Sequence, residues 1–183
     1  QDLLMFYSAN KKELITLREY VDHMAEGQTE IYFASGETTN KIDLLPQVEA
    51  VKDKGYDILY LTDNVDEFCL QMMRDYDSKT FKNVTQGDLN IETEEEKKNL
   101  EEQTNDNKDM IDAIKEALGD KVQDVKLTAR LKNHPVCLTS GEGLSFEMEK
   151  VLKAMPDAQA QELKAGRILE INPNHELFSS LKK

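Results

Sequence analysis

The sequence predicts an α/β protein in two parts: an N-terminal half that is a small three-layer α/β/α domain, and a C-terminal half that is a smaller α+β domain. In the first half, short apolar runs of strand length alternate with helical patterns, which is typical of a mainly parallel sheet covered on both faces. A segment rich in Glu and Lys then interrupts this alternation. The length of 183 residues allows one large domain or two small ones. We therefore expect a boundary near Thr93, with domains at 1–93 and 94–183.

The helices of the first half carry recognisable start and stop signals. Thr16 and Glu19 have the spacing of a capping box. Pro46 suits the first turn of a second helix, and Gly55 suits its end. Asp63 is expected to cap a third helix. The strands expected between these helices lie at residues 3–7, 31–34, 56–61 and 81–84.

The second half has a different pattern. Its charged beginning can form a solvated helix, because Glu and Lys recur at helical spacing with few apolar residues. An apolar stripe over 110–118 predicts a helix that ends at Gly119, and alternation over 125–131 predicts a strand that pairs with 136–138. Further on, we expect a helix that ends at Pro156, a strand at 168–171 and a final helix that starts at Pro173.

The charge of the chain excludes several classes of partner. The formal net charge is −13 and the isoelectric point is about 4.7. Nucleic acids and anionic membranes would be repelled at long range, so neither is an expected partner. No apolar run approaches the length that spans a bilayer, and no secretory signal is recognisable, so we expect a cytoplasmic protein. The chain starts at Gln1 inside an apolar stretch, which indicates a piece of a longer protein.

Cysteine and histidine give no catalytic or metal-binding pattern. Cys69 and Cys137 are far apart, and the three histidines are scattered without ligand spacing. His134 and Cys137 are three residues apart in an expected strand, so their side chains point to opposite faces. A thiol enzyme is therefore excluded as an interpretation, and no metal or cofactor site is predicted.

Three carboxylates mark the start of the third helix, at Asp63, Asp66 and Glu67. Such residues ordinarily cap a helix and complement its dipole. If they converged in a cleft they could hold a divalent cation. A metal-dependent α/β enzyme domain that uses these three residues is therefore the alternative function.

One helix of the second half carries an apolar stripe with two methionines. The flexible, polarisable side chain of methionine suits a surface that accepts many apolar shapes. Spacing alone, however, favours packing into a core. The stripe consists of Leu144, Met148, Val151, Leu152 and Met155.

Several segments in a fixed order resemble the heat-shock protein 90 family of molecular chaperones, whose bacterial type is HtpG. The resemblance covers nearly the whole chain. Leu45, Asn64 and the pair at 133–134 depart from the usual residues of the family. The segments are 19–21 (Glu-Tyr-Val), 31–33 (Ile-Tyr-Phe), 54–63 (Lys-Gly-Tyr-Asp-Ile-Leu-Tyr-Leu-Thr-Asp), 65–68 (Val-Asp-Glu-Phe), 135–138 (Pro-Val-Cys-Leu) and 169–175 (Leu-Glu-Ile-Asn-Pro-Asn-His).

The resemblance implies a fragment with the end of the middle domain and the start of the C-terminal domain. The site for ATP and Mg²⁺ would then lie upstream of Gln1, and the dimerisation helices would follow Lys183. The fragment would be no enzyme, would hold no cofactor, and would be monomeric or weakly associated, whereas the full-length protein is a homodimer. Its partners would be unfolded or partly folded client proteins, with an Hsp70-type co-chaperone system as a further candidate.

The resemblance also gives the apolar stripe a function, because the corresponding helix of similar chaperones contacts clients. On this basis the stripe should be left uncovered by the rest of the protein. Phe68 resembles an aromatic position of the client surface in the middle domain. The residues expected to bind clients are Leu144, Met148, Val151, Leu152, Met155 and Phe68.

Overall fold

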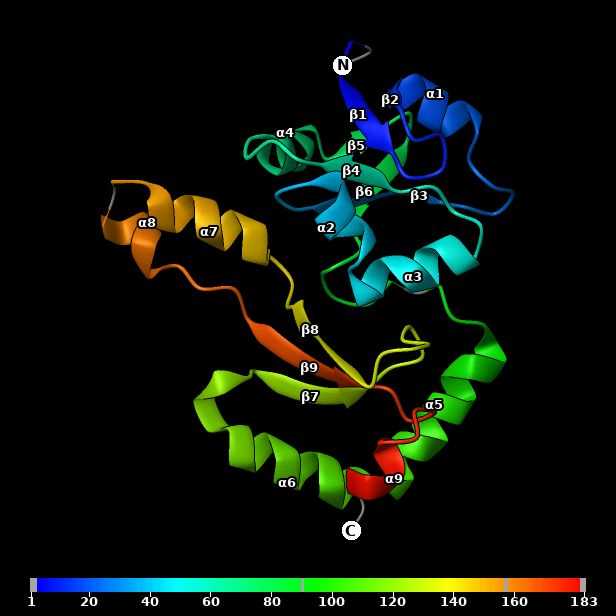
Figure 1. The fold of residues 1–183 in the computed structure, drawn as a ribbon, viewed down its shortest axis with the longest axis vertical. Helices are drawn as coiled ribbons and strands as arrows, with labels where there is room; N and C mark the ends of the chain where they lie inside the picture. Colours follow the sequence, from blue (N-terminus) through cyan, green and yellow to red (C-terminus); the bar gives the residue numbers. More distant parts are fainter. Residues whose placement is uncertain (1–2, 90, 157, 182–183) are drawn as a thin grey trace. The chain divides into compact units, whose positions relative to one another are not determined.

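The computed structural model describes residues 3–89, 91–156 and 158–181, without the side chains at 158 and 159. The chain forms two compact units (Figure 1). Unit 1 consists of Gln1–Thr85 and Phe146–Leu163, and unit 2 of Gln86–Ser145 and Lys164–Lys183. Because a six-stranded and a three-stranded sheet are combined with helices, the mixed α/β class predicted from the sequence is confirmed. The domain division at Thr93 stays a prediction.

Unit 1 is built on the six-stranded sheet, in the order β2-β1-β4-β3-β6-β5. Strand β3 pairs in parallel with β4 and β6, but β1, β2 and β5 pair antiparallel with their neighbours. The expectation of a mainly parallel sheet is therefore wrong, and the sheet is mixed. The strands are β1 (Met5–Ser8), β2 (Leu14–Thr16), β3 (Glu30–Ser35), β4 (Leu59–Leu61), β5 (Asp75–Tyr76) and β6 (Lys79–Asn83).

Two of the three antiparallel pairs, β1–β2 and β5–β6, arise because their connections are too short for a crossover helix. Strands β5 and β6 are joined by Asp77 and Ser78 alone, with φ values of 50° and 61°. Positive φ at both central residues is the geometry of a tight hairpin turn. Residues 9–13 likewise join β1 directly to β2. Neither hairpin was recognised in the sequence.

Helices α1 and α3 of unit 1 begin where the sequence predicts, α4 begins later than expected, and α2 and α8 correspond to no predicted helix. Thr16 and Glu19 form the predicted capping box, and Pro46 opens α3. Asp63 does not cap α4, which starts after Val65 without a side-chain cap. The helices are α1 (Leu17–Asp22), α2 (Thr39–Asp43), α3 (Pro46–Asp53), α4 (Asp66–Met73), α7 (Phe146–Ala154) and α8 (Ala158–Glu162).

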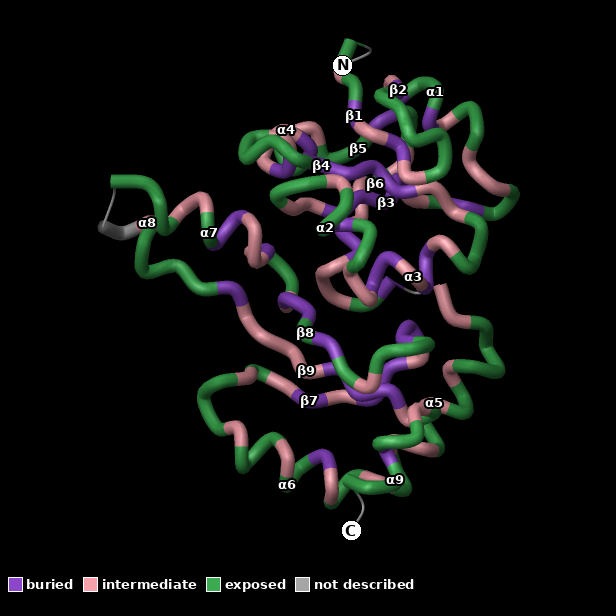
Figure 2. The backbone as a smooth tube through the Cα atoms, viewed as in Figure 1, coloured by how far each residue is buried: buried purple, intermediate pink, exposed green. Residues whose placement is uncertain are grey.

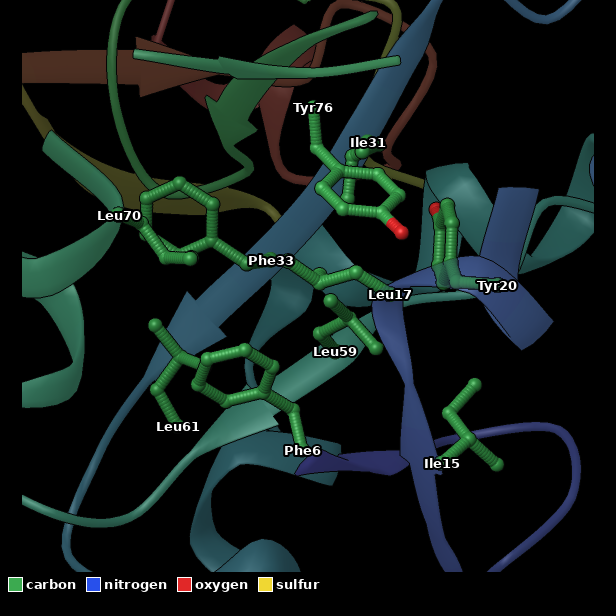
Figure 3. Packing of buried hydrophobic residues seen from close by; sticks show 10 residues of the cluster. All are labelled: Phe6, Ile15, Leu17, Tyr20, Ile31, Phe33, Leu59, Leu61, Leu70 and Tyr76. Carbon is green, nitrogen blue, oxygen red and sulfur yellow. The ribbon is translucent and has the colours of Figure 1, made fainter. Parts of the chain in front are cut away.

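One face of the sheet packs against α1 and α4. Ile31 and Phe33 of β3 form an apolar cluster with Leu70 of α4 (Figure 3). Figure 2 shows that buried positions gather on β3 and β4. Side chains alternate along a strand, so Tyr60 points to the opposite face. There its hydroxyl donates to Asp43 of α2 at 2.6 Å, and the ammonium of Lys52 in α3 lies 5.8 Å from its ring.

A buried tyrosine hydroxyl joins three segments of unit 1. Tyr20 donates to the backbone oxygen of Asp57 at 2.7 Å. It accepts from the backbone N–H of Tyr32 at 3.1 Å and from the side-chain amide of Gln28 at 3.0 Å. The hydroxyl thus ties α1 to β3 and to the segment before β4.

Unit 2 has its own sheet, in the order β7-β9-β8. Strand β9 lies between β7 and β8, parallel to the first and antiparallel to the second, so the predicted pairing of 125–131 with 136–138 is wrong. Val125, Leu127 and Ile171 form its core with Ile111 of α6 and Phe178 of α9. The elements are α5 (Glu94–Asp106), α6 (Lys108–Leu118), a 3-10 turn (Gly119–Lys121), β7 (Asp124–Leu127), β8 (Val136–Ser140), β9 (Arg167–Ile171) and α9 (Phe178–Leu181).

The network of Tyr20 leads to a first prediction. Tyr20→Phe removes one buried hydroxyl and the three hydrogen bonds that it makes, so it should lower the free energy of unfolding by about 1–3 kcal/mol. Tyr56→Phe is the matched control, because Tyr56 is half-buried and stacks on Tyr32 through its ring. Urea unfolding followed by circular dichroism measures both. Equal effects of the two substitutions would contradict a structural role of the Tyr20 hydroxyl.

Candidate functional site

Helix α4 carries two apolar stripes on different sides. The inner stripe includes Leu70, which is fully buried in the core of unit 1, and Met73, which packs against that core. The outer stripe recurs at positions i, i+3, i+4 and i+7, which share one face of a helix. Val65 is 70% exposed and Met72 is 86% exposed. With the half-buried Phe68 and Cys69 between them, the outer stripe consists of Val65, Phe68, Cys69 and Met72.

Acidic side chains surround both ends of α4. Asp63 is exposed, and the carboxylate of Asp66 accepts from the backbone N–H of Asp63 at 3.3 Å. Burial raises the pKa of Asp66 above its usual range. Asp75 and Asp77 are exposed at the other end of the helix. Among the described residues, none of these four carboxylates forms an ion pair.

The three carboxylates of the alternative function do not form a cation site. Glu67 is buried, and its Oε1 accepts from the amide of Asn83 at 3.0 Å. Asp63 by contrast is exposed to solvent. Within the described part of the chain, no group of three His, Cys, Asp or Glu side chains could hold a metal ion. The structure therefore gives the metal-dependent enzyme no support.

Helix α7 places its methionine inward. Met148 is only 7% exposed, and its Sδ accepts from the side-chain amide of Gln71 in α4 at 2.9 Å. Val151 and Leu152 are half-buried, and Met155 after the helix is 40% exposed. An uncovered stripe was expected, but Met148 belongs to the interior of unit 1. The role of the stripe in client binding stays a prediction.

Leu144 is separated from the rest of the stripe by the division into units. It is half-buried and belongs to unit 2, whereas α7 and Phe68 belong to unit 1. The structure thus brings Phe68, Met148, Val151, Leu152 and Met155 into one unit, with Leu144 in the other.

A small cavity lies beside Met148. Its volume is about 40 Å³, and its lining includes Ser35, Glu67 and Val151. The Oγ of Ser35 is buried without a hydrogen-bond partner in the described residues. A cavity of this size and polarity suits a water molecule, but ligand pockets measure about 300 Å³ or more. It is therefore not a site for a substrate.

The most buried charges of unit 2 form a structural cluster. Glu170 is fully buried, and its Oε2 lies 3.0 Å from Nε of Arg130. Its Oε1 accepts from the hydroxyl of Thr139 at 2.9 Å and lies 3.5 Å from the ammonium of Lys126. Burial, reinforced by Glu170, raises the pKa of the Cys137 thiol to about 12. A protonated, buried thiol is a poor nucleophile, so Cys137 is not a candidate for nucleophilic catalysis.

A model of the family "Hsp90 protein" matches residues 1–183, the whole chain. The chain belongs to the Hsp90 protein family. Similar proteins are the chaperone proteins HtpG of Clostridium acetobutylicum (54% identical over 182 residues), Clostridium perfringens (53% over 182) and Bacillus velezensis (50% over 182). Each comparison covers 100% of this chain but only 28% or 29% of the relative.

The segments that carried the resemblance occupy defined places in this Hsp90 chain. Residues 54–63 run from the end of α3 through β4, and 65–68 begin α4. Residues 135–138 enter β8, and 169–175 leave β9. In the described part of the Hsp90 chain, no helix is long and apolar enough to cross a bilayer.

Sequence reasoning missed the exposure of Val65 and Met72. The helical spacing of Val65, Phe68, Cys69 and Met72 indicates one apolar face but does not say whether that face is buried. The signal that could have corrected this is Leu70, which lies about 140° around the helix from Val65 and so requires a second apolar face. A short helix with apolar residues on two faces leaves one of them in solvent.

Two methionines provide a second prediction. Met148→Ala should lower the free energy of unfolding by about 2–5 kcal/mol, because a buried methionine leaves a cavity. Met72→Ala, at an exposed position, should change it by about 0.5 kcal/mol or less. Urea unfolding of both variants is the measurement. If Met148→Ala is as mild as Met72→Ala, then α7 does not pack into unit 1 as described.

Proposed function

We propose that this chain is the client-holding segment of an Hsp90-type chaperone. It binds unfolded or partly folded proteins through exposed apolar side chains on α4 and α7. The observation that supports this most strongly is the outer stripe of α4, where Val65 and Met72 are largely exposed. Exposing a stripe of large apolar side chains to water costs free energy and does not stabilise the fold. Contiguous exposed apolar surface is typical of interaction sites.

The residues inferred from the family have different roles under this proposal. Phe68 belongs to the outer stripe, between its two most exposed members. Met155, with the half-buried Val151 and Leu152, supplies apolar surface on and after α7. Met148 supports the packing of α7, and Leu144 in unit 2 would be a separate contact.

The whole protein would then work as its relatives do. The relatives are named chaperone proteins, and the chain spans less than a third of their length. We propose that ATP and Mg²⁺ bind outside this segment, in a cytoplasmic homodimer that can cooperate with an Hsp70-type system. Residues 1–93 would complete the middle domain, and 94–183 would start the C-terminal domain.

A structural coupling role is the second candidate. Residues 146–163 belong to unit 1, although the strands before and after them, β8 and β9, belong to unit 2. The chain therefore passes from one unit to the other at 85/86, 145/146 and 163/164. Three covalent connections suit a segment that transmits motion, and this role is compatible with client binding.

The client-binding role gives a third prediction. The double substitution Val65→Ser with Met72→Ser should weaken client binding by about 1–2 kcal/mol, because partial burial of two large apolar side chains is lost. The measurement is the amount of chain needed to suppress aggregation of a thermally unfolded test enzyme. Circular dichroism should show an unchanged fold, since both positions are exposed.

Leu44→Ser is the matched control, because Leu44 is 77% exposed elsewhere in unit 1. Suppression should be unchanged by this substitution. Equal suppression by the wild type and by the double variant would refute the role of the outer stripe in holding clients.

A further inference from the structure

Val65 and Met72, at the two ends of the outer stripe of α4, are largely uncovered by the described residues of unit 1. The opposite side of the helix is occupied, because Leu70 is buried in the core and Glu67 is hydrogen-bonded to Asn83. Gln71 contacts Met148 of α7, which occupies a further side. The face of Val65 and Met72 is open to another molecule.

The sequence around this face is predominantly acidic. Residues 62–77 contain a single basic residue, Arg74. The acidic residues of the same stretch are Asp63, Asp66, Glu67, Asp75 and Asp77. A carboxylate two residues before Val65 and another three residues after Met72 therefore bracket the stripe at both ends. The formal net charge of −13 adds a field of the same sign.

We propose that the outer stripe prefers client segments in which apolar side chains are flanked by Lys or Arg. This inference rests on the proposed function and names the class of segment that it selects. The apolar contact supplies affinity regardless of sequence, whereas the flanking charges decide which segments approach. A basic flank is attracted by Asp63 and Asp75, and an acidic flank is repelled.

The charge preference should have a definite strength. An exposed pair of opposite charges contributes little by itself, so two flanking pairs should tighten binding by about three- to tenfold at low salt. Screening shortens the range of these interactions to about 3 Å at 1 M salt, so the preference should then vanish while the apolar contribution remains.

The experiment uses the 183-residue chain and three fluorescent peptides. The peptides share one central apolar segment and differ only in flanks of Lys, Gln or Glu. Dissociation constants from fluorescence anisotropy, at low and high salt, should rank the Lys-flanked peptide as tightest and the Glu-flanked peptide as weakest. The three constants should converge at high salt.

Two pairs of substitutions locate the effect. Asp63→Asn with Asp75→Asn should reduce the preference for the Lys-flanked peptide and leave the Gln-flanked peptide unchanged. Asp22→Asn with Glu26→Gln removes the same formal charge at exposed positions near the end of α1, and it should preserve most of the preference. Equal losses in both pairs would overturn a local selection and indicate a general charge effect.

The outcomes separate this inference from the proposed function. If all three peptides bind equally and Val65→Ser with Met72→Ser weakens all of them, the charge preference is wrong and client holding stands. If no peptide binds, or if that serine pair has no effect, the proposed function of the stripe is wrong, and the charge preference that rests on it is wrong as well.

Discussion

The burial of Leu70 against the six-stranded sheet determines which face of α4 meets solvent. Leu70 packs in one cluster with Phe33 and Leu61, on the face of the sheet that α1 also covers. A helix of eight residues can bury only one side against a flat sheet, and α4 has apolar residues on two. Once the inner side is fixed, Val65 and Met72 must lie outside. The candidate surface follows from this choice of face.

The sequence determined the elements better than their partners. The capping box at Thr16 and the proline at the start of α3 are local signals, and both helices form where these signals predict. Sheet order depends on distant residues, so the insertion of β9 between β7 and β8 could not be read from either strand. The turn at Asp77 and Ser78 lacks the glycine that usually marks a tight hairpin, so neither β5 nor its pairing with β6 could be recognised in the sequence.

Burial of the proposed contact residues was the least predictable property. Met148 and Met72 have the same side chain and lie on apolar helical stripes, yet one is 7% exposed and the other 86%. The difference arises from tertiary neighbours: α4 itself presents Gln71 to Met148, and no described element covers Met72. The family resemblance identified Phe68, but exposure of the stripe around it required the structure.

If the outer stripe holds clients as proposed, the small number of its exposed side chains limits how tightly a client is bound. Apolar contact yields about 25 cal/mol for each Å² removed from water, and ordering a flexible client consumes much of that gain. Val65, Phe68 and Met72 offer only a narrow strip, so one client segment would dissociate readily. A chaperone that must release its clients needs this weakness. Methionine at the end of the strip suits it further, because its flexible side chain adapts to different client shapes without a fixed geometry.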